Sequence, residues 1–131
     1  MEILTEGDRG YVYNGRFTGP VQLEMVCEAG EPEAAGANLA DADIAKIHHE
    51  NGAVTNWHSH PGGQILMLVS GTARVGSADG TVVEIQPGTC VRTAPNEPHW
   101  HGADEGAECT WLGITWGVTD WTDNNPLEEG E

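Results

Sequence analysis

Two histidines separated by one residue constrain the fold of this chain more than any other feature. His58 and His60 lie in the segment 52–71, which reads GAVTNWHSHPGGQILMLVSG. In an extended strand, residues two apart point to the same face, so both imidazoles can converge on one atom. Imidazole is the commonest metal ligand among protein side chains. We therefore interpret the pair as half of a metal site on a β-strand, in preference to two structural histidines.

Two further residues complete the candidate ligand set. Pro61-Gly62-Gly63 predicts a bend or bulge, after which Gln64 begins a new strand near the same point. His99 is the remaining candidate and begins a second His-x-His pair with His101. Mn, Fe, Ni, Zn and Cu all accept imidazole, so the residue types do not choose among these metals. We expect one divalent transition metal, bound by His58, His60, Gln64 and His99.

These spacings resemble the cupin motifs. The first motif, G(X)5HxH(X)3E(X)6G, is matched at Gly52, His58, His60, Gln64 and Gly71, with Gln64 in place of Glu. The second, G(X)5PxG(X)2H(X)3N, is matched at Gly88 and His99, whereas Ala94, Asn96 and Ala103 replace its Pro, Gly and Asn. The chain is similar to the small single-domain cupins that include manganese-dependent hydroxynitrile lyases and carboxymuconolactone-decarboxylase-associated cupins. The resemblance implies an all-β fold, the cupin double-stranded β-helix or jelly-roll barrel, and a homodimer.

The rest of the sequence favours short strands joined by turns. Asp79-Gly80 predicts a hairpin, and the acidic segment 28–42 is predicted to be a long loop. We expect a cupin barrel with an N-terminal strand extension over 1–123, and an acidic, frayed tail over 124–131. Alternation of apolar residues predicts an early strand near 11–13 and further strands over 21–26, 44–49, 64–70, 72–75, 81–85, 89–93 and 109–118.

The charge of the chain excludes two classes of partner. The sequence has 5 basic and 21 acidic residues, a net charge of −16, and Lys46 is its one lysine. Such a surface repels nucleic acids and anionic membranes. The acidic excess favours a halophilic source over an ordinary acidic protein. The N-terminus has no apolar signal segment and no apolar run is long enough to span a bilayer, so we expect a cytoplasmic protein.

The candidate ligands favour Lewis-acid chemistry. Three neutral imidazoles and an amide leave the charge of a divalent ion unneutralised, which suits polarisation of a small oxygenated molecule. Gln64 does not supply the carboxylate of the usual iron-oxygenase triad, so a lyase or isomerase is favoured over a dioxygenase. His101 is the candidate catalytic acid or base, or else a structural neighbour of His99. Candidate pocket residues, which also fit a buried core, are His49, Ile47 and Trp111.

Two functions of different classes remain open. The resembling hydroxynitrile lyases carry a further active-site His on the following strand, and an ungapped alignment places Trp111 there. We therefore do not transfer cyanohydrin cleavage, the activity of those lyases, to this chain. The first hypothesis is a metal-dependent enzyme that acts on a small oxygenated organic molecule. The alternative is a non-catalytic metallocupin that binds a small ligand or a partner enzyme. A third possibility, a metal-free structural barrel, holds only if the four candidate ligands point away from one another in the fold.

Overall fold

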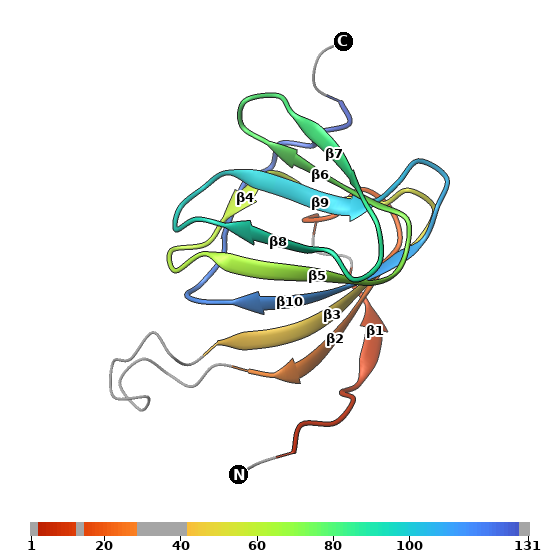
Figure 1. Cartoon of the computed structure of the whole chain (residues 1–131), viewed down its shortest axis with the longest axis vertical. Helices are drawn as coiled ribbons and strands as arrows, with labels where there is room; N and C mark the ends of the chain where they lie inside the picture. Colours follow the sequence, from red (N-terminus) through yellow and green to blue (C-terminus); the bar gives the residue numbers. More distant parts are fainter. Residues whose placement is uncertain (1–2, 13–14, 29–41, 129–131) are drawn as a thin grey trace.

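The computed structural model describes residues 3–12, 15–28 and 42–128, which form two antiparallel β-sheets (Figure 1). The six-stranded sheet has the order β1 (Arg9–Tyr11), β2 (Val21–Cys27), β3 (Asp43–His49), β10 (Cys109–Thr115), β5 (Gln64–Gly71) and β8 (Cys90–Thr93). The five-stranded sheet has the order β11 (Asp120–Trp121), β4 (His58–Ser59), β9 (His99–Ala103), β6 (Ala73–Ser77) and β7 (Val82–Ile85). The described residues contain no helix, and the all-β jelly-roll fold predicted from the sequence is confirmed.

The alternating sequence of β10 explains its central place in the larger sheet. Its residues alternate between buried and half-buried along the whole strand, and it pairs with β3 on one side and β5 on the other. Inward residues of these strands form the core, where Leu66, Leu68 and Trp111 are completely buried. The hairpin predicted at Asp79-Gly80 is also present, since β6 and β7 pair antiparallel across it.

Several boundaries differ from the expected ones. A strand that carries both His58 and His60 was expected, but β4 contains only His58 and Ser59, while Val54 and Thr55 form isolated bridges. Trp121 lies in β11, which pairs with β4 directly opposite His58. Most of the predicted loop 28–42 lies outside the described residues. Within the described residues, no helix has the length and apolar character needed to cross a bilayer.

Candidate metal centre

Strand pairing brings three histidines together at one end of the barrel. His58 on β4 lies directly opposite His99 on β9, and their ring centroids are 4.3 Å apart. His60 projects to the same side, with centroids 4.9 Å from His58 and 5.1 Å from His99. All three side chains are buried, and their candidate ligand atoms lie within 4.8 Å of one another. The predicted ligands therefore converge on one point.

A tight turn after His60 brings Gln64 to the same place. The carbonyl oxygen of His60 accepts hydrogen bonds from the backbone N–H groups of Gly63 (3.0 Å) and Asn96 (2.8 Å). Gly63 has a φ of 83°, and a Cβ added there would lie 2.8 Å from the carbonyl oxygen of Thr93, so glycine is required. Asn96, which stands where the cupin motif has Gly, has a φ of 63°, a conformation that Asn tolerates. The turn and the β8–β9 loop thus fix each other.

Hydrogen bonds at Nδ1 orient all three rings. His58 Nδ1 donates to the carbonyl oxygen of Asn56 (2.8 Å), and His99 Nδ1 donates to that of Glu97 (2.9 Å). His60 Nδ1 is hydrogen-bonded to the hydroxyl of Thr119 at 2.9 Å. A carbonyl only accepts, so the proton of His58 and of His99 is on Nδ1 and the lone pair is on Nε2. Partners of this kind orient metal-binding histidines in known sites.

Gln64 gives a second reason to expect a cation. Its Nε2 donates to the hydroxyl of Thr115 at 2.9 Å, which leaves the amide oxygen facing His99. That oxygen lies 3.2 Å from His99 Nε2. Both atoms present lone pairs, and a cation bound between them would remove their repulsion. His60 Nε2 is buried beside them with no hydrogen-bond partner among the described residues. The donor set therefore fits a divalent transition metal.

Burial keeps these imidazoles neutral. Desolvation lowers the pKa of His60 to about 4 and that of His58 well below its usual value, with repulsion from His99 adding to both effects. Burial also lowers the pKa of His99. Charged imidazole is disfavoured because the barrel interior solvates it poorly. Each ring therefore keeps its lone pair available for a metal at neutral pH.

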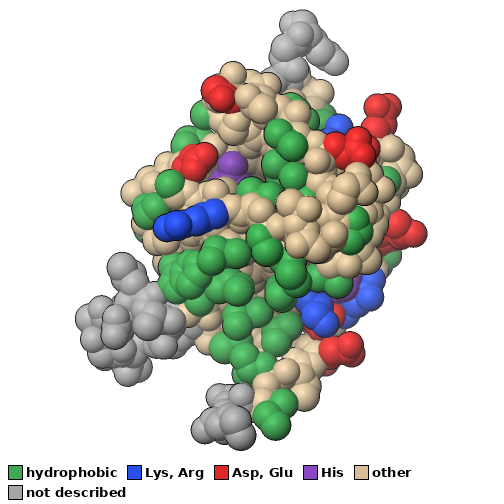
Figure 2. Space-filling model, viewed as in Figure 1, with side chains coloured by type: hydrophobic (Ala, Val, Ile, Leu, Met, Phe, Trp, Pro, Cys, Tyr) green, Lys and Arg blue, Asp and Glu red, His purple; other side chains and the backbone are tan. Residues whose placement is uncertain are grey.

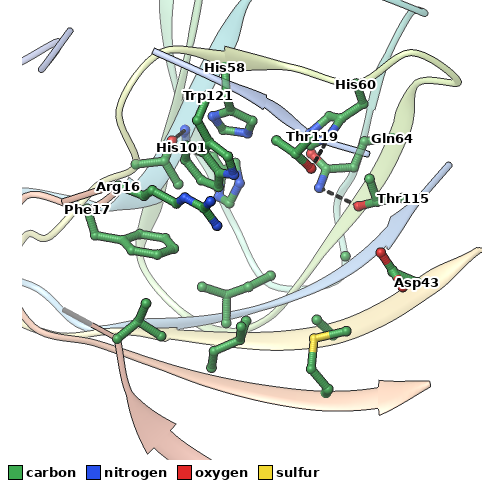
Figure 3. A pocket seen from close by; sticks show the side chains of 17 residues that line it. Arg16, Phe17, Asp43, His58, His60, Gln64, His101, Thr115, Thr119 and Trp121 are labelled. Atoms are coloured by element: carbon green, nitrogen blue, oxygen red, sulfur yellow. Dashed lines mark hydrogen bonds between the residues drawn. The ribbon is translucent and has the colours of Figure 1, made fainter. Parts of the chain in front are cut away.

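Three of the four candidate ligands line a cavity of about 150 Å³ between the two sheets (Figure 3), whereas His99 lines a separate pocket. His58, His60 and Gln64 line one side of it, together with His101. The facing wall comes from β2 and β3 and is mostly apolar, with Leu23, Met25, Ala45 and Ile47. Ile47 thus lines the cavity as expected. The cavity can hold a small organic molecule against the histidines.

His49 and Trp111 lie behind His101 and are not among the residues that line the cavity. Their rings contact the His101 ring edge-to-face, with centroid distances of 5.6 Å for His49 and 5.8 Å for Trp111. His49 faces inward as predicted, yet neither of its nitrogens has a hydrogen-bond partner in the described structure. His48 faces outward and bonds to Glu24 and Thr110. The structure thus places His49 and Trp111 against His101 and in the core.

Three residues at the site were not predicted from the sequence. Thr119 and Thr115 hold His60 and Gln64 through their hydroxyls, and Arg16 lines the cavity. None of the three belongs to a His-x-His pair or to a cupin motif, and Arg16 and Thr119 come from segments outside the motif strands. The one signal in the sequence was position: Thr115 lies inside the expected strand 109–118, and Thr119 directly follows it.

Comparison with known proteins agrees with this geometry. The cupin domain model matches residues 46–115, more than half of the chain. The chain belongs to the cupin family. The matched region includes His58, His60, Gln64, His99 and His101.

Individual cupins extend the comparison. An (R)-mandelonitrile lyase of Granulicella tundricola is 37% identical over 98 residues, which cover 75% of this chain and 70% of that protein. A cupin-like protein of Thermotoga maritima is 30% identical, with a TM-score of 0.76 over the whole of both chains. An acetylacetone dioxygenase of Acinetobacter johnsonii has a TM-score of 0.71 over 95% of this chain and 80% of its own. It is only 14% identical, so it shows the shared fold alone.

Proposed function

We propose that this cupin is a metal-dependent enzyme that acts on a small oxygenated organic molecule. The observation that supports it best is the convergence of His58, His60 and His99 beside a cavity, with lone pairs turned inward. We assign Gln64 as the fourth ligand. A divalent transition metal held there would polarise a hydroxyl or carbonyl oxygen of the substrate. The similarity to an (R)-mandelonitrile lyase favours lyase chemistry within this class.

We assign the proton transfer to His101. Its ring lines the cavity, with its centroid 5.5 Å from that of His58. A neutral imidazole on the cavity wall can accept a proton from a substrate and return it. Trp111, which stands where the resembling hydroxynitrile lyases have a histidine, donates its indole N–H to the carbonyl oxygen of Gly102 at 3.3 Å. Trp111 therefore supplies no base for the reaction.

The proposal is tested by turnover in metal-loaded protein. Protein loaded with Mn, Fe, Ni, Zn or Cu is assayed against cyanohydrins, hydroxy acids and β-diketones. We expect turnover with one of these metals, its loss on chelation, and a fall of about 100-fold in the variant His101→Asn with metal content unchanged. His48→Asn, on the outer face, is the matched control and keeps full turnover. Unchanged turnover in His101→Asn would remove His101 from the reaction.

The alternative is a metallocupin that binds its ligand without converting it. One observation favours it: among the described residues that line the cavity, the only carboxylate is Asp43. Asp43 lies on the opposite side of the cavity from His58 (Figure 3). Apart from Asp43, the described cavity wall therefore offers only histidines as candidate general bases. Ligand binding without turnover, under every metal tried, would establish this alternative.

We also propose that the protein is a homodimer that associates through the outer face of the six-stranded sheet. Hydrophobic side chains gather on this face (Figure 2). They include the half-buried outward residues Ile65 and Met67 of β5 and Leu112 and Ile114 of β10. Two copies that each carry a net charge of −16 repel each other. They can therefore associate most readily through this apolar part of the surface.

The dimer is tested by sedimentation equilibrium. We expect a mass twice the 14.0 kDa of one chain, falling to that of a monomer in the double variant Met67→Glu/Leu112→Glu. Val82→Glu/Val83→Glu places the same two charges on exposed valines of β7, in the other sheet, and leaves the mass unchanged. A monomeric wild-type protein at micromolar concentration would contradict the proposal.

The cytoplasmic location and the halophilic source remain predictions from the sequence.

A further inference from the structure

One glycine interrupts the row of inward side chains on β10. Every second residue of this strand is buried, and the buried set is Cys109, Trp111, Gly113 and Thr115. Gly113 lies among the residues that line the cavity. Its partner on the neighbouring strand β3 is Ala45, which also lines the cavity, so neither strand sends a large side chain into the space at this point. The cavity therefore reaches the backbone of β10 at Gly113.

The backbone does not require a glycine at this position. A glycine is needed where φ is positive, as at Gly63, but Gly113 is not among the described residues with a positive φ. A Cβ added to Gly113 would lie 3.3 Å from Ile47 Cδ1 and 3.4 Å from Leu66 Cδ2, both of which are terminal methyl groups. Its distance to Gln64 Nε2 would be 3.5 Å, an ordinary van der Waals contact. An alanine therefore fits here after small shifts of side-chain ends.

A glycine inside a strand is unfavourable for folding, because it loses more backbone freedom than alanine and packs no side chain. Such a glycine often marks a place where a ligand comes close to the backbone. A second observation points to a ligand in this cavity. His60 lines it and is only 3% exposed, and its Nε2 has no hydrogen-bond partner among the described residues. One wall of the cavity thus lacks a polar partner, and the other lacks a side chain.

We propose that Gly113 determines the ligand specificity of this cavity, because the apolar end of the ligand lies against it. The wall beside Gly113 is apolar, with Ala45 and Ile47 on β3, whereas His60 and Gln64 line the histidine side (Figure 3). A ligand that suits both walls has an oxygen at one end and a short hydrocarbon chain or ring at the other, since hydrocarbon gains free energy by leaving water. The inference rests on the proposed function, because it narrows the substrate class of the same cavity.

The inference is tested without turnover, by NMR titration with straight-chain primary alcohols from ethanol to hexanol. A hydroxyl both donates and accepts, so it can pair with His60 Nε2 in either tautomer. Titrations use wild-type protein and the variants Gly113→Ala and Gly113→Val, each with and without bound metal. Gly10→Ala is the matched control, because Gly10 is an exposed residue of β1 and a Cβ added to it would have no atom within 4 Å.

We expect each further methylene of the alcohol to raise the affinity of wild-type protein about fourfold, until the chain fills the cavity. The rise should stop about one carbon sooner in Gly113→Ala and about three carbons sooner in Gly113→Val, since each added side-chain carbon takes the room of one ligand carbon. Gly10→Ala should match the wild type. Urea unfolding should show that Gly113→Ala is at least as stable as the wild type.

An affinity series that runs equally far in wild-type protein and in Gly113→Val would overturn the inference. A Gly113→Ala protein that is less stable than the wild type, yet binds the full series, would also overturn it, because the glycine would then serve packing alone. If Gly113→Val does not fold, the one-carbon difference in Gly113→Ala decides. A shortened series in metal-free variants supports the role of Gly113 even where the proposed metal function fails. Turnover with an alcohol series that Gly113→Val leaves unchanged would leave the metal function intact.

Discussion

Replacing His99 with alanine is expected to abolish metal binding. His99 occupies the middle of the site, since it pairs with His58 across β4 and β9 and faces the amide oxygen of Gln64 at 3.2 Å. Loss of residues that merely orient a ligand costs about 10- to 100-fold in metal affinity, so loss of a ligand costs more than about 100-fold. Elemental analysis should then fall from about one ion per chain to a trace, with turnover lost as well.

The control for this variant is His48→Ala. It removes a histidine from β3 whose ring bonds to Glu24 and Thr110 on the outer face, so metal content should stay that of the wild type. Circular dichroism must show that both variants keep the β-sheet spectrum, because a loss of fold would also release metal. A folded His99→Ala protein that retained a full complement of metal would place the ion elsewhere.

Acid is expected to destabilise the protein through His49. Burial lowers the pKa of His49 from 6.5 to about 3. Between these values the unfolded chain binds a proton that the folded chain does not, so stability is complete above pH 6.5 and falls as the pH drops towards 3. At 1.36 kcal/mol for each pH unit, His49 alone lowers the free energy of unfolding by about 3 kcal/mol at pH 4 relative to pH 8. That is a large part of the stability of a small domain.

Two variants isolate this contribution. His49→Gln and His49→Leu differ in the packing that they disturb, but both remove the titrating group. In metal-free protein, urea unfolding at pH 8 and pH 4 should show that each variant loses about 3 kcal/mol less stability on acidification than the wild type does. A loss equal to that of the wild type in both variants would mean that His49 is protonated or solvated in the folded protein.

Three of the four candidate ligands, His58, His60 and Gln64, could be placed together because their positions follow from local geometry. A strand turns successive side chains to opposite faces, so His58 and His60 share a direction whatever the rest of the fold does. Pro61-Gly62-Gly63 predicted the turn before Gln64, and that turn is present. The same period put Ile47 and His49 on the inward face of β3, where both are buried. Local sequence was sufficient for all of these.

What could not be predicted depends on contacts between distant segments. An inward direction does not distinguish a cavity wall from a core, and the His101 ring lies between His49 and the cavity. Thr119 reaches His60 only because the chain after β10 returns to β4, where β11 pairs with it. Arg16 comes from the N-terminal side of β2, which no motif marks. These positions follow from strand order and register, which sequence periodicity does not determine.

The most direct test of the metal centre is a crystal structure of the wild-type protein, with anomalous diffraction collected at the absorption edge of the metal that elemental analysis identifies. The account predicts one anomalous peak about 2.0–2.3 Å from the Nε2 atoms of His58, His60 and His99, with the amide oxygen of Gln64 beside it. The Nδ1 atoms should keep their bonds to Asn56, Thr119 and Glu97. A peak away from these rings, or none in protein reconstituted with each candidate metal, would contradict it.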